Sequence, residues 1–252
     1  MALLDVAHLG KTFGGLQAVS DVSFTVDSKK IKAVIGPNGA GKTTLFNLIT
    51  GTLAPSAGSV QFNGRDITGW KPHRIAARGV ARTFQNIKLF AGMSVLENVM
   101  VGRHVRSHGG FLASMLRLPW IGAEERTIRR DAMERLELLG IDHLAEADAT
   151  SLAFGQQRAV ELARALALEP ELLLLDEPAA GLNIYETAEI GRLIASIRAE
   201  LGITVLLVEH DMSLVMDISD EIVVLSFGKK IAEDVPEAIQ RNDEVIKVYL
   251  GE

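Results

Sequence analysis

The sequence contains no cysteine, which excludes disulfide bonds and thiolate metal sites. No apolar run approaches the roughly 20 residues that a membrane-spanning helix needs. The first residues, MALLDVAHLGKTF, carry Asp5 and lack a basic start followed by a long apolar stretch, so they predict no signal peptide. A formal net charge of −6 argues against a protein that mainly neutralises nucleic-acid phosphates, and we expect no nucleic-acid partner. We therefore expect a soluble chain that can still dock on a membrane protein.

What the sequence does contain is apolar residues in short, patterned runs. They make up 48% of the 252 residues, a length that suits one α/β domain with a smaller inserted lobe. SDVSFTVDS places Val22, Phe24 and Val26 on one face at a period of two, and SVQFNGRDI repeats this pattern before an Asn-Gly turn. These runs predict antiparallel strands near the N-terminus.

The rest of the chain predicts a helical insertion followed by a parallel sheet. The stretch from about 86 to 150 should form a mostly helical lobe. Within it, EERTIRRDAMERLELLG places Ile128, Ala132, Leu136 and Leu139 on one helical face, and Gly140 ends that helix. ELLLLDEP and ITVLLVEHD have the uniform apolarity of strands that are buried on both faces. EIVVLSFGKKIAED predicts a β-ribbon, and an amphipathic tail closes the chain.

The segment GPNGAGKTT, residues 36–44, follows a predicted strand, IKAVIG, and opens a predicted helix. It fits the phosphate-binding loop pattern, in which glycines let the backbone amides surround an anion at a helix N-terminus. We assign nucleotide binding to Gly36, Asn38, Gly39, Gly41, Lys42, Thr43 and Thr44. Lys42 would reach the β- and γ-phosphates, and the Thr43 hydroxyl would coordinate Mg²⁺. The alternative is a purely structural glycine turn.

Two acids, Asp176 and Glu177, end the run LLLLDEP. Open α/β sheets place ligand chemistry at the carboxyl ends of their strands. Asp176 would hold Mg²⁺, and Glu177 would orient or deprotonate the attacking water, a role worth roughly 10²–10⁴ in rate. The alternative is a solvated acidic turn. A phosphate-binding loop needs a carboxylate partner for its metal, which favours the catalytic interpretation.

These segments, with SLAFGQQR at 151–158 and a histidine, His210, after a third buried strand, resemble the ATP-binding cassette family in type and order. ARTFQNIKLF, DEPAAGLN, VEHDM and EVIKVYLGE resemble the ATPase subunits of bacterial branched-chain amino acid importers. The resemblance covers essentially the whole chain. It implies an α/β P-loop NTPase core over about 1–85 and 160–252, with a mostly parallel sheet and an N-terminal antiparallel β subdomain. It also implies a helical subdomain over about 86–159, which includes the signature segment, and a C-terminal helix over about 236–250.

The resemblance also implies roles for single residues. Phe13 would stack on adenine, Gln85 would link the Mg²⁺ and water site to the helical lobe, and His210 would contact the γ-phosphate. Gln85 would join Thr43 and Asp176 at the metal, and Glu177 and His210 in catalysis. Ala180 to Asn183, here called the crossing loop, would reach a second subunit. The alternatives are a core aromatic at Phe13, a surface amide at Gln85 and a structural histidine at His210. Asn183 departs from the aspartate common at that point in the wider family.

By the same resemblance, Leu152 to Gln156 is the signature segment. It would bind, through Ala153, Gly155 and Gln156, the γ-phosphate of ATP that is held by the other subunit. From Gly155 the sequence predicts a helix with Ala159, Leu162, Ala163 and Leu166 on its buried face. Ala153 stands where the family usually has serine, so the helix lacks a preferred cap worth about 1 kcal/mol. We expect weaker phosphate binding than a serine would give.

The resemblance implies an ATP-hydrolysing motor subunit of an importer, with ATP and Mg²⁺ as cofactors and branched-chain amino acids as cargo. Its partners would be membrane permease subunits, a second identical or different ATPase subunit and, indirectly, an external binding protein, on the cytoplasmic face of the cell membrane. Urea or amide import, lipopolysaccharide export and a soluble single-cassette assembly ATPase remain alternatives. Six arginines of the lobe form either a solvated face or a permease contact: Arg103, Arg106, Arg117, Arg126, Arg129 and Arg130.

Overall fold

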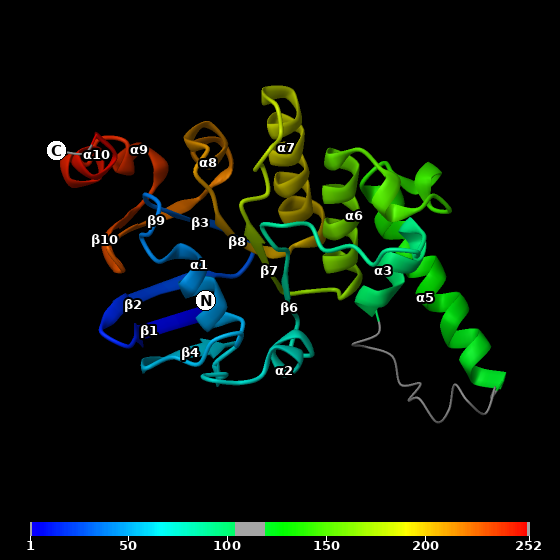
Figure 1. Ribbon diagram of the computed structural model, residues 1–252, viewed down its shortest axis with the longest axis horizontal. Coiled ribbons are helices and arrows are strands. Elements are labelled where there is room, and N and C mark those ends of the chain that lie inside the picture. The colour runs from blue at the N-terminus through cyan, green and yellow to red at the C-terminus, as the bar shows by residue number, and fades with distance from the viewer. Residues whose placement is uncertain (1, 104–118, 251–252) are drawn as a thin grey trace. The chain divides into compact units, whose positions relative to one another are not determined.

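The computed structural model describes residues 2–103 and 119–250 (Figure 1). The chain divides into two compact units. The first, here called the sheet unit, comprises Met1–Ile75 and Glu171–Glu252. The second, the helical unit, is Ala76–Pro170. Within the described ranges, no helix is both long enough and apolar enough to cross a membrane.

The sheet unit begins with an antiparallel sheet in the strand order β2-β1-β4-β5. Its strands are β1 (Ala2–Phe13), β2 (Leu16–Asp27), β4 (Ala57–Phe62) and β5 (Arg65–Asp66). Val22, Phe24 and Val26 of β2 are all buried, as their period-two spacing predicted. Asn63 and Gly64 adopt φ angles of 50° and 69° in the tight turn between β4 and β5. The predicted antiparallel strands and Asn-Gly turn are therefore confirmed.

The second sheet of this unit is mostly parallel. Its strands are β3 (Ile31–Ile35), β7 (Leu172–Asp176), β8 (Thr204–Val208), β9 (Glu221–Ser226) and β10 (Lys229–Asp234). They lie in the order β10-β9-β3-β8-β7, and only β10 pairs antiparallel among them. Every residue of β3, β7 and β8 is buried. This confirms that the uniformly apolar runs of β7 and β8 are strands buried on both faces, as the sequence predicted.

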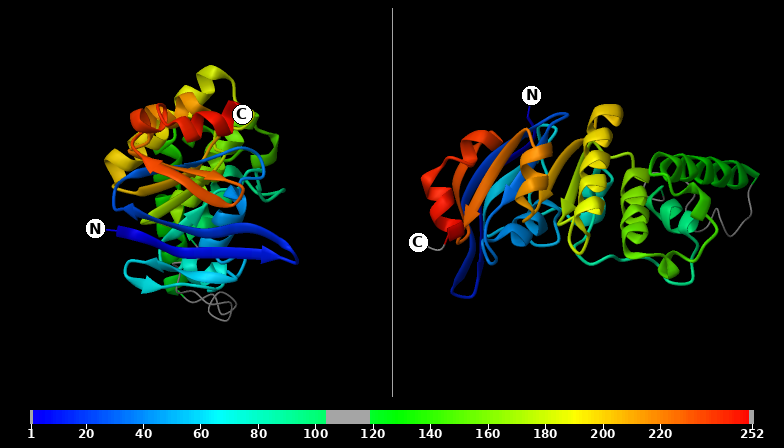
Figure 2. Two further views of the ribbon diagram at one scale, coloured as in Figure 1. Left: turned by 90° about the vertical axis from the view of Figure 1, so that its left-hand side faces the viewer. Right: turned by 90° about the horizontal axis from the view of Figure 1, so that it is seen from above.

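Helices cover both faces of the parallel strands. Figures 1 and 2 show α1 (Lys42–Ile49) on one face and α7 (Ile184–Leu201) with α8 (Met212–Ile218) on the other. Strands β3, β7 and β8 run in the same direction, so their carboxyl ends share one edge of the sheet. The phosphate loop follows β3, the acidic pair ends β7, and His210 follows β8. The topology therefore gathers three distant sequence segments at that edge.

The C-terminal segment differs from the single helix expected over about 236–250. The structure has two short helices, α9 (Pro236–Ile239) and α10 (Asp243–Leu250). The side-chain oxygen of Asn242 accepts hydrogen bonds from the backbone N–H groups of Glu244 (2.9 Å) and Val245 (3.2 Å). Asparagine is a preferred N-cap residue, so a new helix begins after Asn242 where a single continuous helix was expected.

The helical unit contains β6 (Val80–Arg82), α3 (Val95–Arg103), α5 (Pro119–Leu138) and α6 (Phe154–Ala167), with α2 (Pro72–Ala76) at its boundary. Two 3₁₀ turns, Asp142–Leu144 and Ala149–Ser151, connect α5 to α6. The units divide at 75/76 and 170/171, whereas the sequence placed the boundaries near 85/86 and 159/160. The whole of α6 belongs to the helical unit because Val160, Ala163 and Ala167 share one core with Ala132 and Leu136 of α5.

Candidate functional site

The phosphate loop depends on glycine at its tightest points. Gly36, Gly39 and Gly41 have φ angles of 148°, 81° and 99°. A Cβ atom on Gly36 would lie 2.1 Å from the carbonyl oxygen of Leu225, and one on Gly41 would lie 2.5 Å from that of Ala18. Any side chain at Gly36 or Gly41 would therefore displace the loop. The loop leads directly into α1, whose first N–H groups suit an anion.

Lys42, the first residue of α1, folds back over this loop. Its side chain is buried, and its Nζ donates hydrogen bonds to the carbonyl oxygens of Gly36 (2.6 Å) and Pro37 (3.1 Å). Burial lowers the pKa of Lys42, while the nearby carboxylates of Glu177 and Asp176 act in the opposite direction. The cation of the phosphate loop and the acids that end β7 therefore belong to one electrostatic cluster.

The two acids occupy different environments. Asp176 is the last residue of β7 and is 3% exposed, so it is not part of a solvated turn. Glu177 has a positive φ of 51°, and its backbone N–H donates to the carbonyl oxygen of Val208 (2.9 Å) at the end of β8. Positive φ is uncommon for a residue other than glycine and is maintained only when the surroundings enforce it. The hydrogen bond to Val208 thus fixes the position of the Glu177 backbone, from which the carboxylate extends.

His210 lies beside Glu177. Its Nδ1 is 4.0 Å from Oε2 of Glu177 and 3.8 Å from Oε2 of Glu209. The His210 side chain is 62% exposed, unlike a histidine that serves the core. An exposed imidazole next to a partly buried carboxylate can donate a hydrogen bond to an anionic group at the sheet edge.

Sequence reasoning missed Glu209, a carboxylate with no exposed surface. One of its oxygens accepts from the backbone N–H of Ala179 (2.7 Å). The other accepts from the N–H groups of His210 (2.9 Å) and Asp211 (3.3 Å). Glu209 therefore joins Ala179, the residue before the crossing loop, to the backbone that carries His210. The only signal in the sequence is an acid between a buried strand and a histidine, and it does not show which amides the acid binds.

We expect Glu209→Gln to destabilise the sheet unit by about 1–3 kcal/mol, because the amide has one acceptor oxygen and its NH₂ group would face backbone donors. Urea unfolding should measure this loss. Glu200→Gln, the same change at an exposed position of α7, is the matched control and should leave the unfolding midpoint unchanged. Equal midpoints for the two variants would contradict the assigned role of Glu209.

Asn183 begins α7 as its N-cap. Its side-chain oxygen accepts from the N–H groups of Tyr185 (2.9 Å) and Glu186 (3.1 Å), and Glu186 accepts in return from the Asn183 N–H (2.8 Å). This reciprocal pattern is a capping box. Asparagine and aspartate cap helices equally well, which accounts for asparagine here in structural terms.

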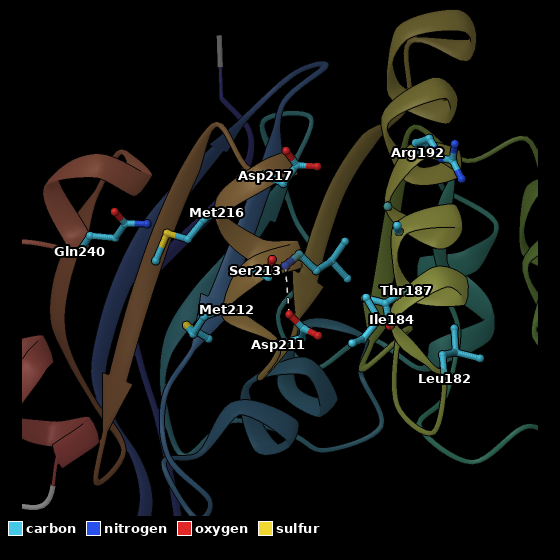
Figure 3. A pocket seen from close by; sticks show the side chains of 13 residues that line it. Leu182, Ile184, Thr187, Arg192, Asp211, Met212, Ser213, Met216, Asp217 and Gln240 are labelled. Atoms are coloured by element: carbon cyan, nitrogen blue, oxygen red, sulfur yellow. Dashed lines mark hydrogen bonds between the residues drawn. The ribbon is translucent and has the colours of Figure 1, made fainter.

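A groove lies next to the crossing loop, between α7 and α8. It has a volume of about 1220 Å³, and Figure 3 shows Leu182, Ile184 and Arg192 on its α7 side and Asp211 and Asp217 on its α8 side. Oδ1 of Asp211 caps α8 by accepting from the N–H of Leu214 (3.1 Å). Ile184, which lines the groove, is 86% exposed, and its neighbour Tyr185 is 84% exposed. Two adjacent apolar side chains thus stand on the surface at the end of the crossing loop.

Phe13 lies at the end of β1 and is 44% exposed, so it is not a core aromatic. The ammonium group of Lys11 is 5.1 Å from its ring centroid. An exposed aromatic face of this kind is available for stacking.

The signature segment lies in the helical unit. Helix α6 begins at Phe154, one residue before the expected Gly155, with Ala153 as its N-cap. Gln156 accepts a hydrogen bond from the Ala153 N–H (3.2 Å), which forms one half of a capping box. The other half needs a side-chain oxygen at 153, which alanine does not have. The first turn of α6 therefore keeps an N–H group that a serine would satisfy.

The structure brings together Lys42, Asp176, Glu177 and His210 in the sheet unit. Gln85, Ala153, Gly155 and Gln156 belong to the helical unit. The side chain of Gln85 is exposed, and its backbone carbonyl accepts a hydrogen bond from Arg158 (2.6 Å). Arg158 was not among the residues selected from the sequence.

The donor set of the sheet unit suits Mg²⁺ with a nucleotide. The Thr43 hydroxyl is exposed at the start of α1, and Asp176 offers a carboxylate in the same electrostatic cluster as Lys42. Among the described residues there is no group of three or more His, Cys, Asp or Glu able to hold a metal ion. Mg²⁺ fits such a site because it is usually bound by one or two carboxylates together with water and substrate phosphates.

Most of the described arginines of the lobe are engaged within the helical unit. Arg103 contacts Asp131 (2.9 Å) and Glu169 (2.8 Å), Arg129 contacts Glu146 (2.7 Å), and Arg130 contacts Asp131 (3.4 Å). Arg106 and Arg117 lie outside the described residues. Exposed pairs such as Arg129 with Glu146 contribute little stability, in keeping with a solvated face.

Comparison with known proteins supports one family. The ABC transporter family matches residues 19–180, and a second family, branched-chain amino acid ATP-binding cassette transporter, matches residues 229–252. The chain is 46% identical over 250 residues to the high-affinity branched-chain amino acid transport ATP-binding protein BraF of Pseudomonas aeruginosa, covering 99% of this chain and 98% of that protein. It is 43% identical over 254 residues to LivG of Escherichia coli K12, with the same coverage.

Solved structures agree with this assignment. The crystal structure of a nucleotide-free ATP-binding cassette from an ABC transporter has a TM-score of 0.85 and 34% sequence identity, with all of both chains covered. A related cassette in its ADP conformation gives the same values. The expected α/β P-loop fold with its mostly parallel sheet is therefore confirmed. By family match, sequence identity and fold, this chain belongs to the ABC transporter family as an ATP-binding cassette.

Proposed function

We propose that the chain is the ATP-hydrolysing subunit of an ABC importer for branched-chain amino acids. The observation that carries the ATPase assignment is the cluster at the sheet edge, where Lys42 of the phosphate loop lies near Asp176 and Glu177. The cargo assignment is supported by the similarity to BraF and LivG and by the matched C-terminal segment. The cargo would contact the permease and an external binding protein rather than this chain.

In this proposal the phosphate loop binds the nucleotide. The backbone from Gly36 to Gly41 surrounds the phosphates, and Lys42 exchanges its bonds with the Gly36 and Pro37 carbonyls for bonds to the β- and γ-phosphates. Asn38, Gly39 and Thr44 complete the loop's contacts, and the exposed ring of Phe13 stacks on adenine. Thr43, Asp176 and Gln85 would hold Mg²⁺, which would neutralise charge on the phosphates.

Glu177 and His210 serve the hydrolytic step. The Glu177 carboxylate orients the attacking water and accepts its proton. His210, whose Nδ1 lies 4.0 Å from Oε2 of Glu177, donates a hydrogen bond to the γ-phosphate. Glu209 positions His210 and Ala179, the residue before the crossing loop, because it accepts hydrogen bonds from their backbone N–H groups. The hydrolytic groups are thus fixed by main-chain contacts on either side.

The second subunit completes each site. The signature segment, through Ala153, Gly155 and Gln156, binds the γ-phosphate held by its partner, and the crossing loop reaches across between them. Exposed Ile184 and Tyr185 support a protein contact at that place. Two such subunits would hold two nucleotides between them, and the closing and reopening of this dimer would drive the permease.

We expect Ala153→Ser to strengthen the signature segment. The serine oxygen would accept from the first turn of α6 and complete the capping box with Gln156, stabilising the helix start by about 1 kcal/mol. Its hydroxyl would also add a donor for the partner's phosphate. Nucleotide-driven dimerisation and the ATPase rate should both increase, as measured by size-exclusion chromatography and phosphate release. Ala123→Ser on the exposed side of α5 is the control, and an Ala153→Ser protein indistinguishable from it would refute the expectation.

The subunit would act at the cytoplasmic face of the cell membrane. To test this, the tagged chain is purified from gently solubilised membranes of its native cell, and co-purifying chains are identified by mass spectrometry. Two permease chains and a second ATPase would support the importer, and loss of radiolabelled leucine uptake on deletion would support the cargo. Recovery with lipopolysaccharide-export components, an activity named for a 33% identical protein of Haemophilus influenzae, would overturn the importer assignment. Soluble partners alone would indicate an assembly ATPase.

A further inference from the structure

A buried ion pair on the signature helix holds the backbone of the loop that carries Gln85. Arg158 and Glu161 lie one turn apart on α6, 6% and 2% exposed, with 3.3 Å between Nη1 of Arg158 and Oε2 of Glu161. Neither residue has a part in the nucleotide chemistry described above. A buried ion pair is weak evidence for net stability, so the groups that it holds indicate its role better than its burial does.

The hydrogen-bond partners of Arg158 and Glu161 indicate the role of the pair. Nη1 of Arg158 donates to the carbonyl oxygen of Phe84 (2.8 Å), and Nη2 donates to that of Gln85 (2.6 Å). Oε1 of Glu161 accepts from the N–H of Phe84 (3.3 Å). The two side chains thus bind the Phe84 and Gln85 main chain from both its donor and its acceptor sides. Planar, forked donors suit two carbonyls at once, a geometry that lysine lacks.

The surroundings of the pair tie it to the signature segment as well. The guanidinium carbon of Arg158 is 5.5 Å from the ring centroid of Phe154, the first residue of α6. Burial raises the pKa of Glu161, and the Phe84 N–H, Arg158 and Arg164 act in the opposite direction. Arg164, 3.9 Å from Glu161, adds a second cation to this cluster. Helix α6 therefore has the signature segment at its N-terminus and binds the backbone of Phe84 and Gln85 through the side chain of Arg158, one turn further along.

We propose that Arg158 and Glu161 are a positioning pair that transmits movement of the signature segment to the loop carrying Gln85. Because the pair holds the main chain, any shift or tilt of α6 moves the Gln85 backbone with it. The contacts of the pair are to Phe84, Gln85, Phe154 and Arg164, so its effect on catalysis acts through Gln85. The kinetic consequence rests on the ATPase function proposed above, whereas the physical tether does not.

Hydrogen–deuterium exchange of the purified full-length chain, with and without ATP and Mg²⁺, tests the tether. Arg158→Lys keeps the charge but loses the bridge between two carbonyls, and Glu161→Gln removes the ion pair but keeps an acceptor. In both variants the 83–87 segment should exchange at least about ten times faster than in the wild-type chain. ATP should still change exchange at 152–158 but no longer at 83–87. Arg129→Lys, which alters an exposed ion pair of the same unit, is the control and should behave as wild type.

Steady-state kinetics provide the readout that a merely structural role would not change. The KM for ATP should stay within twofold of wild type, while kcat falls on the order of 10-fold from misplacement of Gln85. The double variant should be no slower than either single variant if the two residues act as one device. Unchanged exchange at 83–87 in both single variants, or an unchanged kcat, would overturn the proposal. If the wild-type chain shows no ATP-dependent protection at 36–44, the proposed function fails, and exchange at 83–87 without nucleotide still decides whether the tether exists.

Discussion

Replacing Glu177 with glutamine should stop ATP turnover while leaving ATP binding intact. Glutamine keeps the shape of the side chain and the backbone N–H bond to Val208, but it cannot accept a proton. Loss of a general base costs roughly 10²–10⁴ in rate, so kcat for phosphate release should fall by that factor. The dissociation constant for ATP, measured by equilibrium dialysis, should stay close to the wild-type value. Because hydrolysis would no longer reopen it, the ATP-bound dimer should accumulate on size-exclusion chromatography.

The control for this experiment is Glu189→Gln, the same exchange at an exposed position of α7. It should leave kcat unchanged. If Glu177→Gln retained more than about a tenth of wild-type kcat, the base would have to be another group, because a general base typically contributes roughly 10²–10⁴ in rate. His210, whose Nδ1 lies 4.0 Å from Oε2 of Glu177, would then be the first residue to substitute.

Replacing Lys42 with methionine should weaken ATP binding itself. Methionine retains most of the buried apolar stem and removes the ammonium group that bonds to the Gly36 and Pro37 carbonyls. Charge-assisted hydrogen bonds contribute about 1.5–3 kcal/mol, so the dissociation constant for ATP should rise on the order of 10- to 100-fold. The value of kcat/KM should fall further, because the cation also faces charge that develops on the phosphates in the transition state.

Lys71→Met changes an exposed lysine of the same unit and should leave ATP affinity unchanged. Comparison with Glu177→Gln separates the two roles: the lysine variant should bind ATP weakly, and the glutamate variant should bind ATP normally and fail to hydrolyse it. Wild-type ATP affinity in Lys42→Met would contradict the assignment of residues 36–44 as the binding loop.

The candidate site was predictable from the sequence where its chemistry depends on local spacing. Gly36, Gly41 and Lys42 form one contiguous motif, and their loop geometry follows from glycine conformations that the motif encodes. Asp176 could be placed because a uniformly apolar strand of a parallel sheet ends at the ligand-binding edge. In both cases the information lies within a few neighbouring residues.

Residues that act through tertiary contacts could not be found in this way. Glu209 binds the amide of Ala179, thirty positions earlier, and Arg158 binds carbonyls more than seventy positions earlier in the chain. Their partners are backbone groups, which look alike at every position of a sequence. Likewise, the extent of the helical unit depends on which hydrophobic core Ala163 and Ala167 of α6 pack into. Amphipathic spacing shows that one face of a helix is buried but does not show against which elements it packs.

The capping box at Asn183 has a mechanical consequence. It joins the crossing loop to the first turn of α7, whose 18 residues extend to Leu201 before Gly202 ends the helix beside Lys29. At 1.5 Å per residue the helix is about 27 Å long, so a rotation of about 5° at the loop moves its far end by about 2 Å. A rotation of α7 at the crossing loop would therefore shift Leu201 and Gly202, at the far end of the helix, by that distance.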